Sequence, residues 1–163
     1  MAGTSPPLLI AWHSRTGAAR ALALAAREGA GDAALLLPCE QVRPQHLLAA
    51  RAYLFACPEN LAALSGAMKE MFDRCYYPVL GRIEGRAYAT MIAAGSDGAG
   101  AQRQLDRICT GWRLRRVAES WIVCTAAQTA EEILAPKLLA ETTLDQARLM
   151  GAGLAEGLAQ GIF

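Results

Sequence analysis

Short apolar runs alternate along the chain with longer segments in which apolar residues recur every three or four positions. Each run is apolar throughout, as a strand covered on both faces is, and the longer segments have the spacing of amphipathic helices. Strict alternation of strands and helices predicts an α/β fold with a parallel sheet and helices on both of its faces. The predicted strands span residues 8–12, 33–37, 52–57, 86–94 and 118–124.

Glycine and proline positions delimit the first half of this pattern. The first helix is expected over residues 17–28, with Gly29-Ala30-Gly31 as its end. Residues 44–50 predict a short helix with Pro44 in its first turn. Pro58 is expected to close the third strand, because proline cannot donate a hydrogen bond to a strand ladder.

The later helices are predicted from caps and apolar spacing. Ser65 is expected to cap a helix that ends at Tyr76-Tyr77-Pro78, and residues 95–100 form a glycine-rich turn before a helix that ends near Gly111. Two further caps follow, Thr129-x-x-Glu132 for a short helix that Pro136 interrupts and Thr143-x-x-Gln146 for the last helix, with Ala147, Gly151, Leu154 and Leu158 facing inward.

The first apolar run ends in a turn that carries hydroxyl groups and a glycine, His13-Ser14-Arg15-Thr16-Gly17. The unpaired N–H groups at the start of the following helix, and the positive end of its dipole, favour an anion there. Ser14 and Thr16 add hydroxyls, and Arg15 adds a forked positive charge. We interpret residues 13–19 as a phosphate cradle; an ordinary capped helix after a buried strand is the alternative.

Two common phosphate motifs are excluded at this turn. A Walker loop requires a lysine after its second glycine, and no lysine follows Gly17. A dinucleotide fingerprint requires three glycines in the pattern G-x-G-x-x-G, and the turn has only one. A site for a single phosphomonoester is what remains.

The turn resembles the phosphate loop of the flavodoxin-like family, specifically its small NAD(P)H-dependent FMN reductase branch, which carries S/T-x-T-G-x-T. Ser14, Arg15, Thr16 and Gly17 match that pattern, whereas Ala18 and Ala19 replace polar residues. Two side-chain donors are therefore missing, while the backbone N–H groups remain. The resemblance implies one domain over residues 1–163, a three-layer flavodoxin-like sandwich with a five-stranded parallel sheet of order 2-1-3-4-5.

Two further segments carry the same resemblance. Residues 57–69 are similar to the family's P-E-x-x-x-x-x-S-G-x-x-K segment, and the glycine turn at residues 95–100 is similar to its third flavin-contacting loop. Ligands of such sheets bind beyond the carboxyl ends of the strands, where strand order reverses, and flavodoxin is a known example of this rule. The resemblance therefore implies FMN contacts from three loops. The candidate cofactor-binding residues are Ser14, Arg15, Thr16, Gly17, Ala18, Ala19, Pro58, Glu59, Asn60, Leu61, Ser96, Asp97, Gly98 and Gly100.

Several polar residues near these loops have competing interpretations. Asn60 either bonds the pyrimidine edge of the flavin or holds a turn, and Glu59 is interpreted as a solvated loop carboxylate. His13 is assigned to loop packing, because hydride transfer to a flavin needs no acid–base residue, and no catalytic side chain is assigned. The arginines at positions 103, 107, 113, 115 and 116 fit a solvated helix face better than a site for the extra phosphate of NADPH.

The resemblance implies an oxidoreductase in which NADPH or NADH reduces bound FMN, which then reduces a quinone or another small-molecule electron acceptor. Since no separate nicotinamide fingerprint is present, both substrates would use one open face in turn, a ping-pong scheme. The alternative is a flavodoxin-like electron-transfer or binding protein without turnover, with FMN binding weakened or lost through Ala18 and Ala19.

Composition narrows the classes of partner. Hydrophobic residues make up 53% of the 163 residues and charged residues 19%, which is typical of a folded domain, and no apolar run is long enough to span a membrane. A net charge of +1 predicts no general attraction to nucleic acid or membrane surfaces. The chain also lacks the excess of acidic residues that is typical of dedicated electron shuttles.

Cysteine usage and the first residues bear on location and assembly. Five scattered cysteines without a C-x-x-C predict no metal site and fit buried thiols in a reducing cytoplasm. Residues 1–7 lack a basic segment before an apolar core, so a cytoplasmic location is expected. Tyr76-Tyr77-Pro78 is either packed beneath a loop or an exposed aromatic patch that would serve a homodimer or homotetramer.

Overall fold

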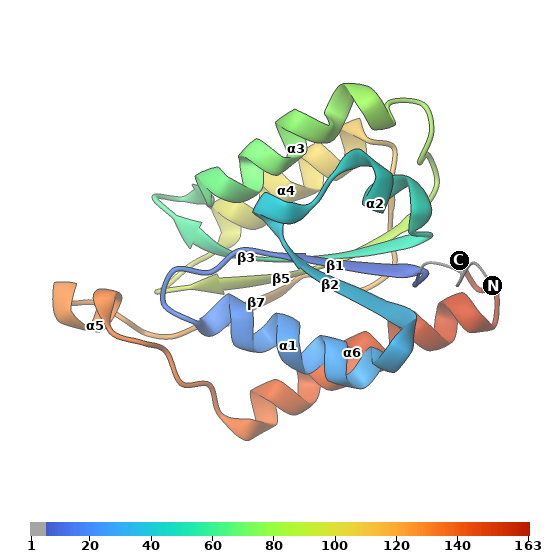
Figure 1. Cartoon of the computed structure of the whole chain (residues 1–163). Helices are drawn as coiled ribbons and strands as arrows, with labels where there is room; N and C mark the ends of the chain where they lie inside the picture. Colours follow the sequence, from blue (N-terminus) through green and yellow to red (C-terminus); the bar gives the residue numbers. More distant parts are fainter. Residues whose placement is uncertain (1–5) are drawn as a thin grey trace.

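The apolar runs form one sheet in the computed structural model, which describes residues 6–163 (Figure 1). Its order is β2-β1-β3-β5-β6; β7 also pairs with β5, and the short β4 pairs antiparallel with β3. All the other pairs are parallel, so the predicted order of the five main strands is confirmed. The strands are β1 Leu8–Trp12, β2 Ala34–Pro38, β3 Ala52–Asn60, β4 Ala63–Leu64, β5 Ala87–Ala94, β6 Arg115–Arg116 and β7 Trp121–Cys124.

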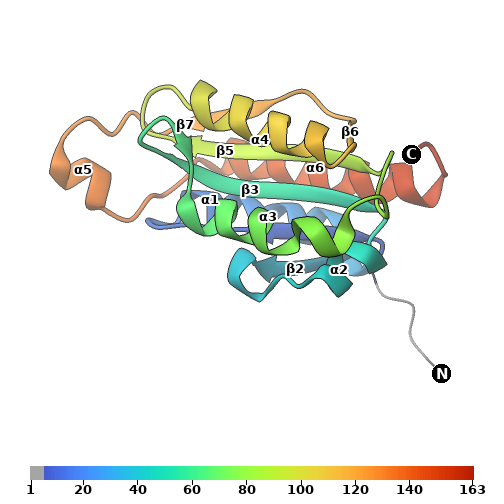
Figure 2. The ribbon, with the colours of Figure 1, turned by 90° about the horizontal axis from the view of Figure 1, so that it is seen from above.

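Helices cover both faces of this sheet, which gives the three-layer α/β sandwich (Figures 1 and 2). On one face lie α1 (Ala18–Ala30) and α6 (Glu141–Ala159), and on the other lie α2 (Pro44–Ala49), α3 (Gly66–Val79) and α4 (Ala99–Gly111). Successive side chains of a strand point to opposite faces. Leu9 of β1 therefore joins the core beneath α3 and α4, and its neighbour Leu8 joins the core beneath α1.

Helices α1 and α6 cross with their backbones in close contact. A Cβ added to Gly29 would overlap the carbonyl oxygen of Arg148, and one added to Gly151 would overlap that of Ala26. The helix ends within the predicted Gly29-Ala30-Gly31 segment, because α1 continues to Ala30 and Gly31 is its C-cap, while Gly29 lies inside the helix at the crossing point. The predicted inward face of α6 is confirmed, since Ala147, Gly151, Leu154 and Leu158 are buried.

Two other helix ends differ from prediction. Pro78 lies inside α3, which continues to Val79 because Cys75 and Val79 are both buried against the sheet. Thr143 does not cap α6, which begins at Glu141. The Arg148 guanidinium bonds the carboxylates of Glu141 (2.6 Å) and Asp145 (2.7 Å), so ion pairs hold the additional first turn.

Strand ends also differ from prediction. Pro58 does not close β3, which continues to Asn60 because Glu59 and Asn60 pair with β4. The fifth strand, predicted over residues 118–124, is shorter and begins at Trp121 as β7; the two-residue β6 precedes the predicted range, and both pair with β5. Four cysteines are buried as expected, but Cys124 at the end of β7 is exposed, which corrects that prediction.

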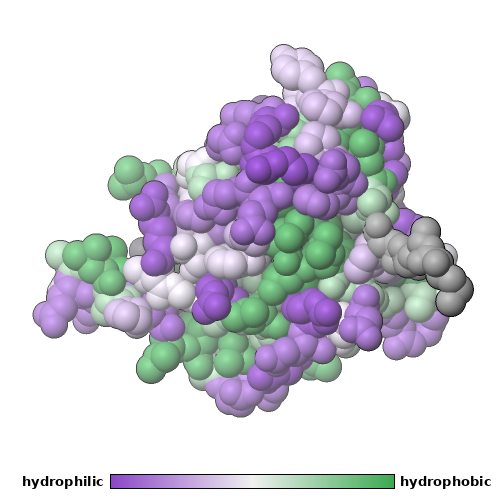
Figure 3. All heavy atoms as spheres, viewed as in Figure 1, coloured by the Kyte–Doolittle hydropathy of each residue, from purple (hydrophilic) through white to green (hydrophobic). Residues whose placement is uncertain are grey.

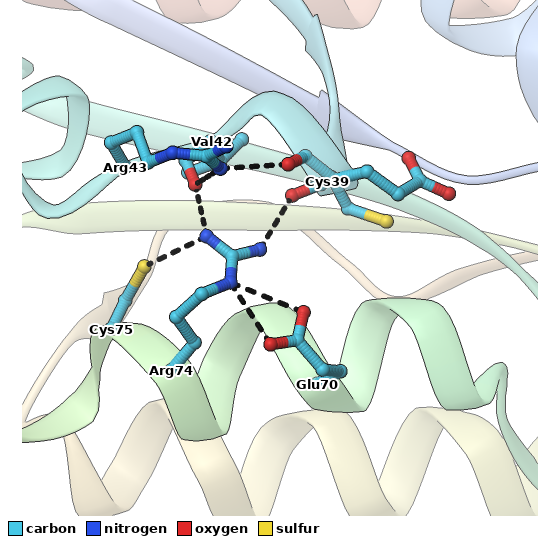
Figure 4. Close-up of polar contacts among 7 residues, drawn as sticks. Cys39, Val42, Arg43, Glu70, Arg74 and Cys75 are labelled. Carbon is cyan, nitrogen blue, oxygen red and sulfur yellow. Dashed lines mark hydrogen bonds and ion pairs between the residues drawn. The ribbon is translucent and has the colours of Figure 1, made fainter.

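Arg74 joins α3 to the turn after β2 (Figure 4). Its Nε donates to the Glu70 carboxylate (2.9 Å), and its Nη groups donate to the carbonyls of Cys39 (3.1 Å) and Val42. On the same helix, Lys69 Nζ donates to the Asp73 carboxylate (2.7 Å). The Arg74 bonds to Cys39 and Val42 fix the η2 turn (Cys39–Gln41) beside the end of β1.

The Thr129 cap predicted before Pro136 is confirmed. It opens α5 (Ala130–Leu134), where Glu132 N–H donates to Thr129 Oγ1 and the Glu132 carboxylate accepts from Thr129 N–H. Figure 1 shows α5 beyond the carboxyl ends of the strands, apart from both helical layers. Within residues 6–163, no helix combines the length and the apolar composition needed to cross a bilayer.

Candidate functional site

A cleft of about 360 Å³ opens at the carboxyl ends of the strands, between the loops that follow β1, β3, β5 and β7. Its volume falls in the range of ligand pockets. Of the residues predicted from sequence, the structure places seven in its walls, Ser14, Arg15, Thr16, Ala18, Pro58, Glu59 and Asn60. Its remaining walls are residues 93–95 and five residues after β7, which are Thr125, Ala127, Ile133, Leu134 and Lys137.

The predicted cradle forms one end of the cleft. Gly17 precedes α1 at φ +103°, a backbone conformation that favours glycine, and its N–H donates to Ser14 Oγ (3.0 Å). The first turn of α1 carries no acidic side chain, so no carboxylate competes for its free N–H groups. This end of the cleft therefore has the helix start and the hydroxyls from which the sequence predicts an anion site, and the binding of an anion stays a prediction.

Ala18 and Ala19 differ in what they face. Both are buried and pack with Ala93 of β5 and Leu139. Ala18 also lines the cleft, whereas Ala19 does not. Of the two missing hydroxyls, only one at position 18 would face a ligand in the cleft, so only its absence should affect ligand binding directly.

The β3–β4 hairpin (residues 59–64) forms the second wall. At its tip, Leu61 and Ala62 have φ of +51° and +62°, the paired left-handed conformation of a type I′ turn that Asn-Gly usually occupies. Positive φ at two residues that carry a Cβ stores backbone strain. The Leu61 side chain is fully exposed and does not line the cleft.

Helix α4 supports this hairpin and accounts for one of the predicted glycines. A Cβ on Gly100 would overlap the Ala62 carbonyl oxygen, and Gln104 Oε1 accepts from Leu64 N–H (3.0 Å). Gly98 likewise packs against protein, because a Cβ there would overlap Ile122 Cγ2. Both glycines are explained by packing, and neither they nor Gly17, Ser96 or Asp97 line the cleft. Their contact with a cofactor stays a prediction.

A hydrogen bond joins the cradle to the hairpin. With its amide oriented so that each atom meets a complementary partner, Asn60 Oδ1 accepts from Arg15 Nε (3.2 Å) and Nδ2 donates to the Glu59 carbonyl (3.0 Å). Glu59 is only partly exposed and lies in the cleft wall, and its Oε2 atom is buried without a hydrogen-bond partner among the described residues. The interpretation of Glu59 as a solvated carboxylate is therefore wrong for this oxygen, which is shielded from solvent and has no donor among the described residues.

His13 anchors the cradle from behind. Its Nδ1 lies 2.9 Å from Ser65 Oγ, and its Nε2 lies 3.9 Å from a Glu40 carboxylate oxygen. Burial lowers the pKa of His13, with Arg15 adding to that shift and Glu40 opposing it. Ser65 therefore bonds His13 instead of capping α3 with its side chain. His13 does not line the cleft, in agreement with a packing role.

No ligand-binding motif was recognised in the sequence of the wall after β7. The signal that locates it is topological, since every loop at the carboxyl end of this sheet borders the same crevice. No group of three or more His, Cys, Asp or Glu side chains within residues 6–163 is arranged to hold a metal ion.

The fold and the cleft together define a flavodoxin-like domain, and solved structures agree. A flavodoxin from the domain Archaea superposes with a TM-score of 0.76 at 14% identity, covering 93% of this chain and 98% of that one. A flavodoxin, WrbA-like protein from Agrobacterium tumefaciens gives 0.69 at 20% identity, covering 94% and 97%. The flavodiiron protein from Giardia intestinalis gives 0.73 at 18% identity, covering 91% of this chain and 35% of that one.

The family follows from sequence. The family model described as NADPH-dependent FMN reductase matches residues 42–128, just over half of the chain, so the protein belongs to this family. The matched region includes the hairpin and the loop after β5 and lies beyond the cradle. No curated protein matches the sequence.

Proposed function

We propose that the protein binds FMN in this cleft and acts as an NAD(P)H-dependent oxidoreductase towards a small acceptor. The observation that carries the proposal is the buried, unpartnered Glu59 Oε2 in the same cleft as an anion-binding helix start. Leaving such an acceptor without a donor costs free energy, so a ligand that supplies a donor there is favoured. FMN has a phosphate at one end and an N–H on the pyrimidine edge of its ring at the other.

Each end of FMN has protein groups suited to it. The phosphate would be held by the free N–H groups of the first turn of α1, with Ser14, Arg15 and Thr16 around it. Ser14 Oγ accepts from Gly17 N–H, which leaves the hydroxyl proton of Ser14 as a donor for a phosphate oxygen. The ring edge would donate to Glu59 Oε2, with Asn60 and Arg15 beside it.

Bound FMN would supply the redox chemistry, and the side chains would bind and orient it. His13, beside the cradle, contacts Ser65 and Glu40, so we assign no acid–base residue. NAD(P)H and the acceptor would approach the same open face of the bound FMN in turn, which is a ping-pong scheme.

The test is FMN titration followed by steady-state kinetics. The purified protein is expected to bind FMN, and NADPH or NADH is expected to reduce a quinone with parallel double-reciprocal lines. A protein that binds FMN without turning over either nicotinamide would fail as a reductase. Intersecting lines would instead refute the proposal that NAD(P)H and the acceptor use one face of the flavin in turn.

A second candidate is an electron-transfer or binding role without turnover. It is supported by Ala18 in the cleft wall, where a hydroxyl-bearing residue would add a phosphate donor, and by the likeness to flavodoxins. A ligand specific for the native state raises its stability. A colourless protein whose melting temperature does not change in millimolar FMN would reject FMN binding in both candidates.

A further inference from the structure

The segment between β7 and α6, residues 125–140, which we call the arm, forms a wall of the cleft. It contains α5, which Figures 1 and 2 show beyond the ends of the strands. Two apolar side chains of the arm line the cleft while remaining largely in water: Ile133 is 53% exposed and Leu134 is 77% exposed. Figure 3 shows apolar surface, in green, at the tip of the molecule where Figure 1 places α5.

Lys137 makes hydrogen bonds both within the arm and between the arm and the cradle. Its backbone N–H donates to the Thr16 carbonyl (2.7 Å). Its Nζ donates to the carbonyls of Glu132 (2.6 Å), Ile133 (3.0 Å) and Ala135 (2.6 Å), at the end of α5. An ammonium group has three N–H donors, so these three carbonyls use all of them.

This geometry separates two roles that a lysine in the wall of an anion site could have. A lysine that binds phosphate directs its N–H donors at the ligand, whereas the Nζ donors of Lys137 bond carbonyls of the arm. Thr16 meanwhile contributes its carbonyl to the arm and its hydroxyl-bearing side chain to the cleft. The arm is therefore held beside the cradle at a defined position.

We infer that the arm covers the flavin ring through Ile133 and Leu134, and that Lys137 is the residue that positions the arm. The inference rests on the proposed FMN site and adds a binding element to it. A flat ring in the cleft would remove water from two exposed apolar side chains, which favours binding. Arm and ring thus make contact without involving the phosphate.

Comparing FMN with riboflavin, which lacks the phosphate, tests the role of Lys137. Lys137→Met is expected to weaken the binding of both ligands by the same factor, about tenfold, because it loosens an apolar wall. Lys69→Met is the matched control, since it replaces the chain's other lysine, which pairs with Asp73 away from the cleft. Loss of FMN binding alone, with riboflavin unchanged, would make Lys137 a phosphate ligand and overturn the inference.

A second pair of variants tests the apolar contact. Ile133→Ser with Leu134→Ser is expected to weaken both ligands about tenfold and to leave the melting temperature unchanged, since both side chains are exposed. Leu138→Ser is the control, because Leu138 is exposed on the same arm and does not line the cleft. Unchanged affinities would overturn the inference, and so would a change in oligomeric state, because the arm would then cover a second copy. If the wild-type protein binds neither ligand, the proposed function itself fails.

Discussion

Arg15 Nε donates to Asn60 Oδ1 at 3.2 Å, and this bond links the cradle after β1 to the hairpin after β3. The two residues lie 45 positions apart in the sequence, and each has a neighbour that faces the same cleft. Their contact joins the cradle to the end of β3, where Asn60 also donates to the backbone carbonyl of Glu59. It thus relates the two groups on which the proposed FMN site depends.

Asn60→Ala is expected to weaken FMN binding about fivefold, because the exposed Arg15–Asn60 bond contributes about 1 kcal/mol to the orientation of both walls. Arg15 would then lose its anchor while keeping its charge. Fluorescence titration of FMN measures the change. Arg15→Lys keeps the charge but not the bond to Asn60, so it should weaken FMN binding by a similar factor if the bond acts only by orienting the site. Wild-type affinity for FMN in the Asn60→Ala variant would refute the link.

Ala18→Ser is expected to tighten FMN binding about fivefold, because it places a hydroxyl donor in the wall of the cradle. Riboflavin affinity should not change, since the added donor faces the phosphate. Ala19→Ser is the control, because Ala19 is buried against protein and its hydroxyl would lack a partner. Equal effects of the two variants on FMN affinity would contradict the placement of position 18 in the site.

Glu59→Leu is expected to act in opposite directions on stability and binding. Without ligand, removal of an unpartnered buried oxygen should leave the protein as stable or more stable, by about 1 kcal/mol. FMN binding should weaken about tenfold, because the ring edge loses its acceptor. Chemical denaturation and FMN titration measure the two effects. Glu59→Gln keeps an acceptor oxygen and should bind more tightly than the leucine variant; the reverse order would refute the contact.

Sequence reasoning succeeded where one element is specified by its own residues. Strands β1, β2, β3 and β5 are largely apolar and separated by helices, so a parallel sheet followed from the pattern, whereas the strand order and the crevice followed from the resemblance to the flavodoxin-like family. The close packing of Gly29 was not predicted, because it depends on Arg148, which lies in the last helix. Leu61 and Ala62 gave no turn signal, since neither is a residue that favours positive φ.

The arm was missed for a related physical reason. Every residue of α5 is exposed, so the helix has no buried face and its sequence no amphipathic spacing. Only the Thr129 cap was recognisable, because capping depends on residues three positions apart. That the arm borders the cleft depends on Lys137 and Thr16, which are 121 positions apart.

His13 is expected to make folding stability depend on pH below its ordinary pKa of 6.5. Burial holds the pKa of His13 lower in the folded protein than in the unfolded chain, so the unfolded chain binds more protons as the pH falls. The stability that neutral His13 allows is complete above 6.5 and is lost as the pH falls from 6.5 through the folded-state pKa. Urea denaturation between pH 7.5 and 5 measures this slope, which His13→Gln should flatten; an unchanged slope would assign it to other groups.

Gly29→Ala and Gly151→Ala are each expected to destabilise the protein by about 3 kcal/mol, because the new methyl group would force the backbones of α1 and α6 apart. Gly153→Ala is the matched control on α6, since a Cβ there meets no neighbouring atom and alanine has the higher helix propensity. It should stabilise by about 0.5–1 kcal/mol. Urea denaturation of the three variants separates packing from propensity. Were Gly151→Ala to behave as Gly153→Ala does, the close approach of the two helices would be refuted.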